Sequence, residues 1–200
     1  MRITAEEKQA THRRIVDAAL TLFSTNGFEA TTTRDIARAA EIGTGTLFNY
    51  FDTKEAIVAS LAEDAVTKAR KGFARQTFDS GFEEHLFGLV AVELRQLKPI
   101  RRFITSILET LLCPLVIAKQ TEENQALRVG HLETVIEIAH QHGIAEVSPV
   151  ALQMYWTLYT GVLVFWAADR SPKQEQTLAL LDQSLHMFVT YLVSTSNEPR

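Results

Sequence analysis

Hydrophobic residues along this chain recur at the spacing of α-helices, and no stretch alternates at the spacing of a strand. The first apolar stripe advances in steps of three and four residues and comprises Ile15, Ala18, Ala19, Leu22 and Phe23. Asn26 and Gly27 follow this stripe and are typical of the left-handed residue that ends a helix. The pattern therefore predicts a first helix over about Thr11 to Thr25.

Two short helices separated by a tight turn are predicted next. Thr32 precedes Asp35 by three residues, a spacing at which a hydroxyl and a carboxylate each satisfy a backbone N–H at a helix start. We expect one helix from Thr33 to about Ala40, a turn at residues 41–43, and another helix from Thr44 to Phe51. Because helices this short are unstable alone, both must pack on the first helix through an apolar seam. The seam consists of Ile36, Ala37, Ala40, Ile42, Leu47 and Phe51.

The remaining stripes predict a larger helical body. A second cap at residues 52–55 begins a long helix, and the helices expected from there are about Thr53 to Arg75, Phe82 to Leu97, Ile100 to Leu112 and Glu122 to His142, with Pro99, Pro114 and Gly143 at the joints. Ser148-Pro149 and Ser171-Pro172 each place an N-cap serine before a proline at the first helical position. Two final helices should begin there and end near Asp169 and Val193. The fold class is all-α.

The composition limits the possible classes of protein but does not identify a binding partner. Of the 200 residues 46% are hydrophobic and the net charge is −4, while the segment up to Lys54 holds seven basic and seven acidic residues. Nucleic-acid binding can therefore be inferred only from the positions of the basic residues, not from their number. The first residues lack the pattern of a secretory signal and Cys113 is the single cysteine, so we expect a reducing cytoplasm. Cys113 lies in an apolar run and is interpreted as a buried thiol without a role.

The segment from Thr32 to Phe51, TTRDIARAAEIGTGTLFNYF, resembles the helix-turn-helix of the TetR family of transcriptional regulators, as does the Thr-Lys-Glu that follows. The motif resemblance covers about Arg13 to Leu61, and beyond it only the helical layout and residues 161–172 are similar. The family usually has glycine where this chain has Glu41 and serine where it has Gly43, so a difference in the turn is expected. The resemblance implies an N-terminal three-helix DNA-binding domain over residues 1–54 and a helical dimerisation and ligand-binding domain over 55–200.

The outward side of the third helix holds the candidates for base contact. With Leu47 and Phe51 turned inward, the side chains left facing out are Thr44, Gly45, Phe48 and Asn49. Asparagine can pair bidentately with adenine, threonine offers a hydroxyl and a methyl, and glycine permits close approach. Arg34, at the start of the second helix, can reach a guanine or a phosphate.

Phosphate contacts are a separate role, since they hold a protein in register without reading sequence. Thr33, Thr46, Tyr50 and Lys54 suit this role. The resemblance implies that the hydroxyls of Thr33 and Tyr50 and the ammonium of Lys54 touch the DNA backbone, beside the positive end of the fourth helix. The alternative interpretation is that Tyr50 and Phe48 are core aromatics and Lys54 a solvated charge.

Residues 150–168, VALQMYWTLYTGVLVFWAA, are apolar on nearly every face, so both sides of this helix need a cover. A transmembrane span is one interpretation, but Gln153, Thr157 and Thr160 interrupt it and no second span follows. Burial between the chain's own core and a second copy is preferred, with the last two helices of each copy forming a four-helix bundle. The residues expected in this dimer interface are Tyr155, Gly161, Val162, Trp166, Leu178, Leu181, Leu185, Phe188 and Leu192.

The resemblance also implies a ligand cavity in the body whose occupation releases DNA. Candidate apolar lining residues are Phe87, Phe103, Ile107, Leu111, Met154, Trp156 and Tyr159, and candidate polar anchors are Glu109, His131 and Gln153. Aromatic residues at helical spacing are also typical of plain core. A metal site at His131, His140 and His142 with Glu133 and Glu137 is not favoured, because the spacing from the first histidine to the others is not one helical turn. No metal or cofactor is expected.

The leading hypothesis is a homodimeric repressor that binds a palindromic double-stranded operator and is released by a small, largely apolar effector. Two-fold symmetry would separate the two recognition helices by roughly 34 to 36 Å. An enzyme is the first rival class, but the sequence has no nucleophile elbow, metal-ligand set or phosphate loop. A helical interaction module that has lost DNA binding is the second rival, and Glu41, Gly43 and the neutral N-terminal charge are its support.

Overall fold

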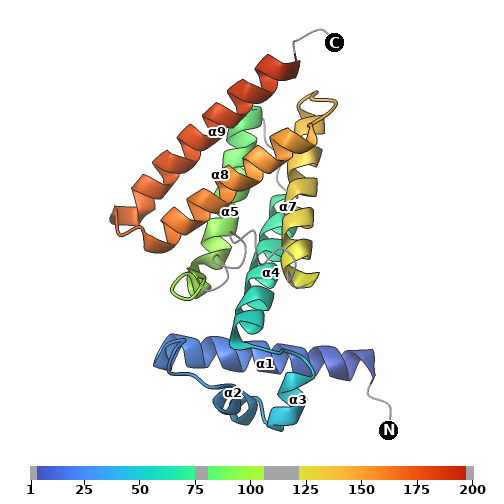
Figure 1. Cartoon of the computed structure of the whole chain (residues 1–200), viewed down its shortest axis with the longest axis vertical. Coiled ribbons are helices and arrows are strands. Elements are labelled where there is room, and N and C mark those ends of the chain that lie inside the picture. The colour runs from blue at the N-terminus through green and yellow to red at the C-terminus, as the bar shows by residue number, and fades with distance from the viewer. Residues whose placement is uncertain (1–3, 75–80, 106–121, 197–200) are drawn as a thin grey trace.

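The computed structural model describes residues 4–74, 81–105 and 122–196, and the regular elements within these ranges are all helical. In chain order they are α1 (Ala5–Asn26), α2 (Thr33–Ala39), α3 (Thr44–Phe48), α4 (Lys54–Phe73), α5 (Phe82–Leu97), the 3-10 turn η1 (Lys98–Ile100), α7 (Glu122–Gln141), α8 (Pro149–Ala168), the 3-10 turn η3 (Pro172–Gln174) and α9 (Glu175–Ser196). Figure 1 shows a small head, formed by α1 to α3, at one end of an elongated molecule, and a body, formed by α5 to α9, at the other. The all-α fold class is confirmed.

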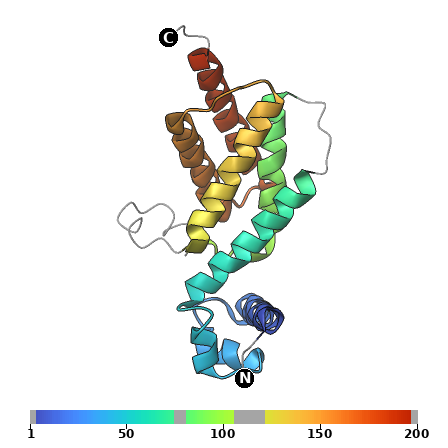
Figure 2. The ribbon, with the colours of Figure 1, turned by 90° about the vertical axis from the view of Figure 1, so that its right-hand side faces the viewer.

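The helix α4 connects head and body without a break (Figure 2). It begins at Lys54, where the Thr53 hydroxyl oxygen accepts a hydrogen bond from the Ala56 N–H at 3.1 Å. It contacts α1 in the head and both α5 and α7 in the body. Buried side chains of the head, of α4 and of the body form one hydrophobic cluster. A domain boundary after residue 54 would fall at the first residue of this shared helix, so the boundary stays a prediction.

The head is built on the predicted seam. Ile36, Ala37, Ala40, Leu47 and Phe51 are buried and Ile42 is half-buried against them. The helix α1 begins at Ala5, earlier than the apolar stripe indicated, because Thr4 and Glu7 form a capping box. The Glu7 N–H donates to the Thr4 hydroxyl at 3.2 Å, and the Thr4 N–H donates to the Glu7 carboxylate at 2.8 Å. The two N-terminal turns are polar, so an apolar stripe could not reveal them.

The start of α9 differs from the prediction. Proline at 172 begins the short turn η3, and α9 itself begins at Glu175. The Ser171 hydroxyl accepts from the Gln176 N–H at 3.2 Å, and the Asp169 carboxylate is a second capping group, which accepts from the Ser171 N–H at 2.7 Å, the Thr177 N–H at 3.0 Å and the Thr177 hydroxyl at 2.6 Å. A carboxylate offers more acceptor sites than a hydroxyl, so it can satisfy both the turn and the helix start.

Several predicted residues lie outside the described part of the chain. They are Ile107, Glu109, Leu111, Cys113 and Pro114, together with residues 106–112 of the helix expected from Ile100 to Leu112. Ile100, expected to begin that helix, ends the turn η1.

The apolar helix α8 is partly covered by its own chain. Among the described residues it is the one helix long and apolar enough to cross a membrane by length and composition, and 44% of its most apolar window is buried. It packs on α9 and α7, as a core helix does. Its C-terminal end is held by Arg101, whose Nε donates to the Trp166 carbonyl oxygen at 2.8 Å and whose guanidinium also bonds the Asp169 carbonyl oxygen. One face of α8 remains open to solvent.

Candidate DNA-binding surface and effector site

The short helix α3 has one buried and one exposed side. Leu47 is 0% exposed and Phe51 is 3% exposed, so these two side chains anchor the segment in the head. The exposed residues are Gly45, Thr46, Phe48 and Asn49, and Thr44 is half-buried at the helix start. Phe48 is 46% exposed, which rules out the interpretation of this ring as core. In Figure 1, α3 lies on the side of α1 that faces away from the body.

The turn before α3 keeps a left-handed residue although it lacks the glycine expected there. Glu41 has φ 56°, and the Ile42 N–H donates to the Ala37 carbonyl oxygen at 3.0 Å, as at the end of many helices. A left-handed conformation costs a side-chain-bearing residue about 1 kcal/mol. Gly43 occupies the N-cap of α3 with φ −70° and supplies no side-chain cap. The turn therefore has the conformation that glycine would favour, although residue 41 is a glutamate.

The start of α2 presents one free and one paired arginine. Thr32 and Asp35 form the predicted capping box, with the Asp35 N–H donating to the Thr32 hydroxyl at 3.2 Å. Hydrogen bonds from Thr32 hold the pKa of Asp35 below its usual value, and Arg38 pairs with the same carboxylate. Arg34 is exposed and has no ion-pair partner within the described ranges, whereas Thr33 is half-buried. Arg34 is thus the cation of α2 without an ion-pair partner in the described ranges.

The structure gives Lys54 a partner within the head. Its ammonium donates to the Phe28 carbonyl oxygen at 2.9 Å and lies 4.5 Å from the centroid of the Phe28 ring. An ammonium has three N–H donors, so two remain for a phosphate. Tyr50 is half-buried at the edge of the same surface. The phosphate roles of Thr33, Thr46, Tyr50 and Lys54 stay predictions, as do the base contacts.

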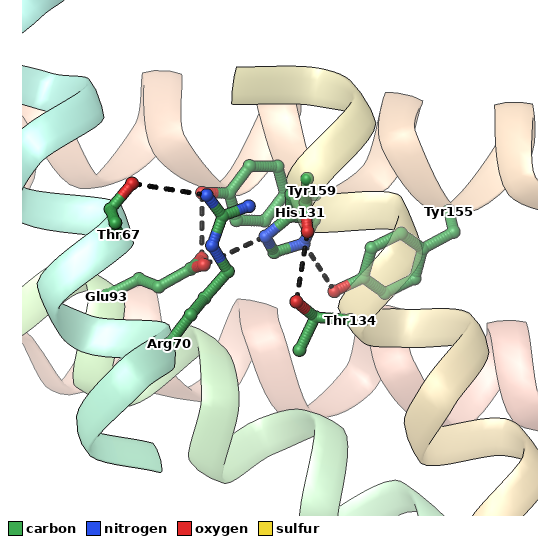
Figure 3. Close-up of polar contacts among 8 residues, drawn as sticks. Thr67, Arg70, Glu93, His131, Thr134, Tyr155 and Tyr159 are labelled. Atoms are coloured by element: carbon green, nitrogen blue, oxygen red, sulfur yellow. Dashed lines mark hydrogen bonds and ion pairs between the residues drawn. The ribbon is translucent and has the colours of Figure 1, made fainter. Parts of the chain in front are cut away.

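A buried polar cluster lies where α4, α5, α7 and α8 meet (Figure 3). Glu93 of α5 is 0% exposed and His131 of α7 is 1% exposed, and the His131 Nδ1 lies 2.9 Å from a Glu93 carboxylate oxygen. The Tyr159 hydroxyl donates to the other carboxylate oxygen at 2.9 Å, and the Tyr155 hydroxyl lies 3.0 Å from the His131 Nε2. If Nδ1 donates to the carboxylate, Nε2 accepts from Tyr155, and every group in the chain of bonds is satisfied.

The surroundings of this cluster disfavour further negative charge. Burial, together with the nearby Glu93 carboxylate, raises the pKa of Tyr155 and Tyr159 well above the usual value.

Arg70 of α4 extends toward the cluster in Figure 3 and lies against the backbone of Gly130, where a Cβ atom would be 2.6 Å from its Nη1. That Nη1 is buried and has no hydrogen-bond partner within the described ranges. The Nη1 of Arg70 is therefore a donor group beside the cluster that has no acceptor among the described residues.

Sequence reasoning found His131 but missed Glu93 and Arg70. Glu93 lies on the apolar stripe of α5 formed by Leu86, Leu89, Val90, Leu94 and Leu97. A carboxylate at a core position was the signal that could have found it, because isolated buried charges are rare. Among the other pocket candidates, Phe103, Trp156 and Tyr159 are buried and Phe87 is half-buried. Gln153 and Met154 lie on the outer face of α8, where Arg128 donates to the Gln153 amide oxygen at 2.6 Å, so they do not line a pocket inside the body.

The other histidines do not join His131. His140 is exposed, as are Glu133 and Glu137. His142 lies against His85 of α5, with 3.0 Å between the His85 Nδ1 and the His142 Nε2. Burial and the neighbouring His142 lower the pKa of His85. No group of three or more potential metal ligands occurs in the part of the chain that the structure describes.

Most residues expected in a dimer interface lie in the protomer's own core. Those between 0% and 4% exposed are Tyr155, Val162, Trp166, Leu181, Leu185, Phe188 and Leu192. These seven side chains are buried within one protomer, and a place for them in a dimer interface stays a prediction. Gly161 and Leu178 are exposed. The open face of α8 carries Val150, Met154, Thr157, Gly161, Val164 and Phe165.

Comparisons with known proteins match both the head and the whole fold. The family model described as "Bacterial regulatory proteins, tetR family" matches residues 15–61. The HTH-type transcriptional repressor KstR2 of Rhodococcus jostii (strain RHA1) is 47% identical over 51 residues, which are 26% of this chain and 25% of that protein. The uncharacterized HTH-type transcriptional regulator YvkB of Bacillus subtilis (strain 168) is 30% identical over 132 residues, 64% of this chain and 68% of that protein. A solved TetR transcriptional regulator from Rhodococcus sp. RHA1 has a TM-score of 0.73 at 16% identity, covering 91% of this chain and 97% of that one.

Proposed function

The chain belongs to the TetR family of transcriptional regulators, and on this premise we propose that it is a repressor that binds a palindromic operator as a homodimer and leaves it when a small effector binds the body. It is a regulator and not an enzyme. The observation that carries the proposal is the two-sided α3: Leu47 and Phe51 hold it in the head while Phe48 and Asn49 are exposed. The place of action is the cytoplasm, where the DNA is.

Base recognition is assigned to Thr44, Gly45, Phe48 and Asn49 of α3 and to Arg34 of α2. A helix of this length can enter a major groove only if its outward side chains are free of the protein. Arg34 is free because Asp35 is already occupied by Arg38. Phosphate contact is assigned to Thr33, Thr46, Tyr50 and the two remaining donors of Lys54.

The dimer is proposed to form through the open face of α8 and the exposed side of α9. On α9 the exposed apolar residues are Leu178, Leu180, Met187 and Val193. A monomer would leave this apolar area in water, whereas two copies related by a two-fold axis would cover it as a four-helix bundle. Nothing lies within 4 Å of a Cβ atom placed on Gly161, so a partner helix can approach closely there.

The effector is proposed to bind at the polar cluster, between α4, α5, α7 and α8. The unused Nη1 of Arg70 suits a largely apolar molecule that carries at least one hydrogen-bond acceptor, since Glu93 and His131 are already bonded within the protein. Because α4 runs from Arg70 to Lys54 as one helix, a ligand that shifts α4 at Arg70 is proposed to move the head. A coupling free energy of about 1 to 3 kcal/mol between the two sites is typical of such regulators.

The test begins with selection of binding sites from random duplexes by the full-length protein, followed by titration against salt. We expect a palindromic site. Lys54→Ala should weaken binding to all sequences alike and lower the salt slope by about one unit, whereas Asn49→Ala should relax the preference at one base position and leave the slope unchanged. A wild-type protein indifferent to every duplex at low salt would overturn the proposal and favour the helical interaction module.

A further inference from the structure

The N-terminal end of α1 extends past α3, as Figure 1 shows. The buried face of α1 carries Ile15, Val16, Ala19 and Phe23. Lys8 and His12 continue the same face toward the N-terminus, at helical steps of four residues. Where the face packs on the rest of the head it is apolar, and where it extends beyond α3 it is polar. This change of character marks a polar surface beside the segment after α3, in which His12 contacts Phe51 and Ser60.

A hollow lies at this place. Its lining residues are Ala5, Lys8, Gln9 and His12 of α1 and Tyr50 from the segment after α3. His12 is fixed in the wall, since its ring lies 4.9 Å from the Phe51 ring centroid and its Nε2 is 3.4 Å from the Ser60 hydroxyl. Lys8, Gln9 and Tyr50 have no side-chain hydrogen bond or ion pair to any residue that the structure describes. The hollow thus offers an ammonium, an amide N–H and a hydroxyl that no described residue uses.

These donors match a phosphodiester better than a base or an acidic peptide. The hollow is lined by one cation and no carboxylate, and the nearby Glu7 is turned back to the Thr4 N–H. It is also continuous with α3 through Tyr50, which follows Asn49 directly. When α3 lies in a major groove, the strand at the edge of that groove passes beside the helix, and its phosphates are the groups that reach such a hollow.

We propose that this hollow holds a phosphate of the strand flanking the α3 groove, with Lys8 as its cation, Gln9 and Tyr50 as further donors, and α1 as a third DNA-contacting helix. The proposal rests on the proposed function, because it presumes that α3 binds duplex DNA. It extends the contact surface beyond the helix-turn-helix to a residue in the second turn of α1.

The experiment compares Lys8→Gln with Lys71→Gln on the selected operator by fluorescence anisotropy over a range of salt concentrations. Lys71 is exposed in the last turn of α4, so its substitution makes the same change in net charge far from the hollow. Lys8→Gln should lower the salt slope by about 0.9 and Lys71→Gln should not. Base preference should be the same in both variants. Equal slopes for the two variants would overturn the inference.

A double-mutant cycle separates a shared phosphate from independent effects. If Lys8 and Tyr50 bind one phosphate, the loss in affinity for Lys8→Gln with Tyr50→Phe should be smaller than the product of the single losses. Strictly multiplicative losses would overturn the shared site. Failure of the inference is distinct from failure of the proposed function, because in the first case wild-type protein still binds its operator and in the second it binds no duplex.

Discussion

Lys54 and Phe28 join the start of α4 to the loop between α1 and α2. The Lys54 ammonium donates to the Phe28 carbonyl oxygen at 2.9 Å and lies over the Phe28 ring. The Phe28 ring packs edge-on against Phe23 at 5.0 Å between centroids, and Phe23 lies 5.5 Å from Phe103 of the body. A cation proposed to touch DNA is thereby linked through three aromatic rings to the body.

This contact predicts that Lys54 stabilises the head as well as binding DNA. Lys54→Met keeps the aliphatic stem but removes the hydrogen bond and the cation–π contact, and should lower the free energy of unfolding by about 1 to 2 kcal/mol. The measurement is urea unfolding without DNA. Lys71→Met, on an exposed turn of α4, is the control and should change stability by less than about 0.5 kcal/mol. Equal stability of the two variants would contradict the structural role.

Glu41 is held in a left-handed conformation, so replacing it by glycine should stabilise the protein. Its φ is 56°, a region that glycine adopts without steric strain. Glu41→Gly should raise the free energy of unfolding by up to about 1 kcal/mol, since relief of strain slightly exceeds the added entropy of the unfolded chain. Glu41→Ala removes the same carboxylate but keeps a Cβ atom, and should give no gain. A loss of stability in Glu41→Gly, measured by thermal unfolding, would count against this account.

The buried cluster should be a strongly coupled unit. Glu93→Gln leaves the shape unchanged but presents an amide N–H to a group that now donates to a carboxylate oxygen, so we expect a loss of about 2 to 4 kcal/mol in the free energy of unfolding. Tyr159→Phe removes one donor to the same carboxylate. In urea unfolding the double variant should lose less stability than the sum of the single losses. Simple additivity would show that the two side chains do not share this bond.

The cap of α9 should make stability depend on acid pH. Hydrogen bonds from Thr177 and Ser171 hold the pKa of Asp169 well below its usual value. The unfolded chain, with an Asp pKa of about 3.9, then binds a proton at a higher pH than the folded chain does. The contribution of Asp169 is therefore present above about pH 4 and is lost as the pH falls through the folded pKa.

Asp169→Asn tests this dependence, because the amide does not titrate. Thermal unfolding followed between pH 2 and pH 7 should show a lower plateau for the variant near neutral pH and a shallower fall in acid. Asp182→Asn, an exposed α9 position, serves as the matched control and should reproduce the wild-type acid profile. An unchanged acid limb in Asp169→Asn would mean that Asp169 does not carry this dependence.

Substitution of Gly161 should have opposite effects on the stability of the protomer and on that of the dimer. Nothing lies within 4 Å of a Cβ atom placed on Gly161 or on Gly72 of α4, so either substitution by alanine should favour its helix by about 0.5 to 1 kcal/mol. If partner helices meet closely at Gly161, Gly161→Ala should still weaken the dimer, by about tenfold in dissociation constant. Sedimentation equilibrium measures this constant, with Gly72→Ala as control. A dimer unchanged by Gly161→Ala would place the interface elsewhere.

Local patterns foretold the helices and the two sides of α3, but not how the body's polar groups meet. Capping at Thr32 follows from Asp35 three positions later and capping at Ser148 from the proline directly after it, and the inward position of Leu47 and Phe51 follows from their spacing. The start of α1 at Ala5 and the role of Asp169 were missed. The cap at Thr4 has the same three-residue spacing to Glu7 as the cap at Thr32, so its signal was present in the sequence, whereas Asp169 bonds a residue eight positions away.

By itself the sequence determined the all-α class, the helix-turn-helix and its exposed residues, because these depend on contacts within a few residues or on one apolar seam. Only the tertiary structure decided that Glu93 meets His131 and Tyr159, since the three lie on different helices and nothing local relates them. It also decided which face of α8 is open. A helix that is apolar on nearly every face has no periodicity from which to tell its own core from a partner, so the packing of α9 against it had to supply that choice.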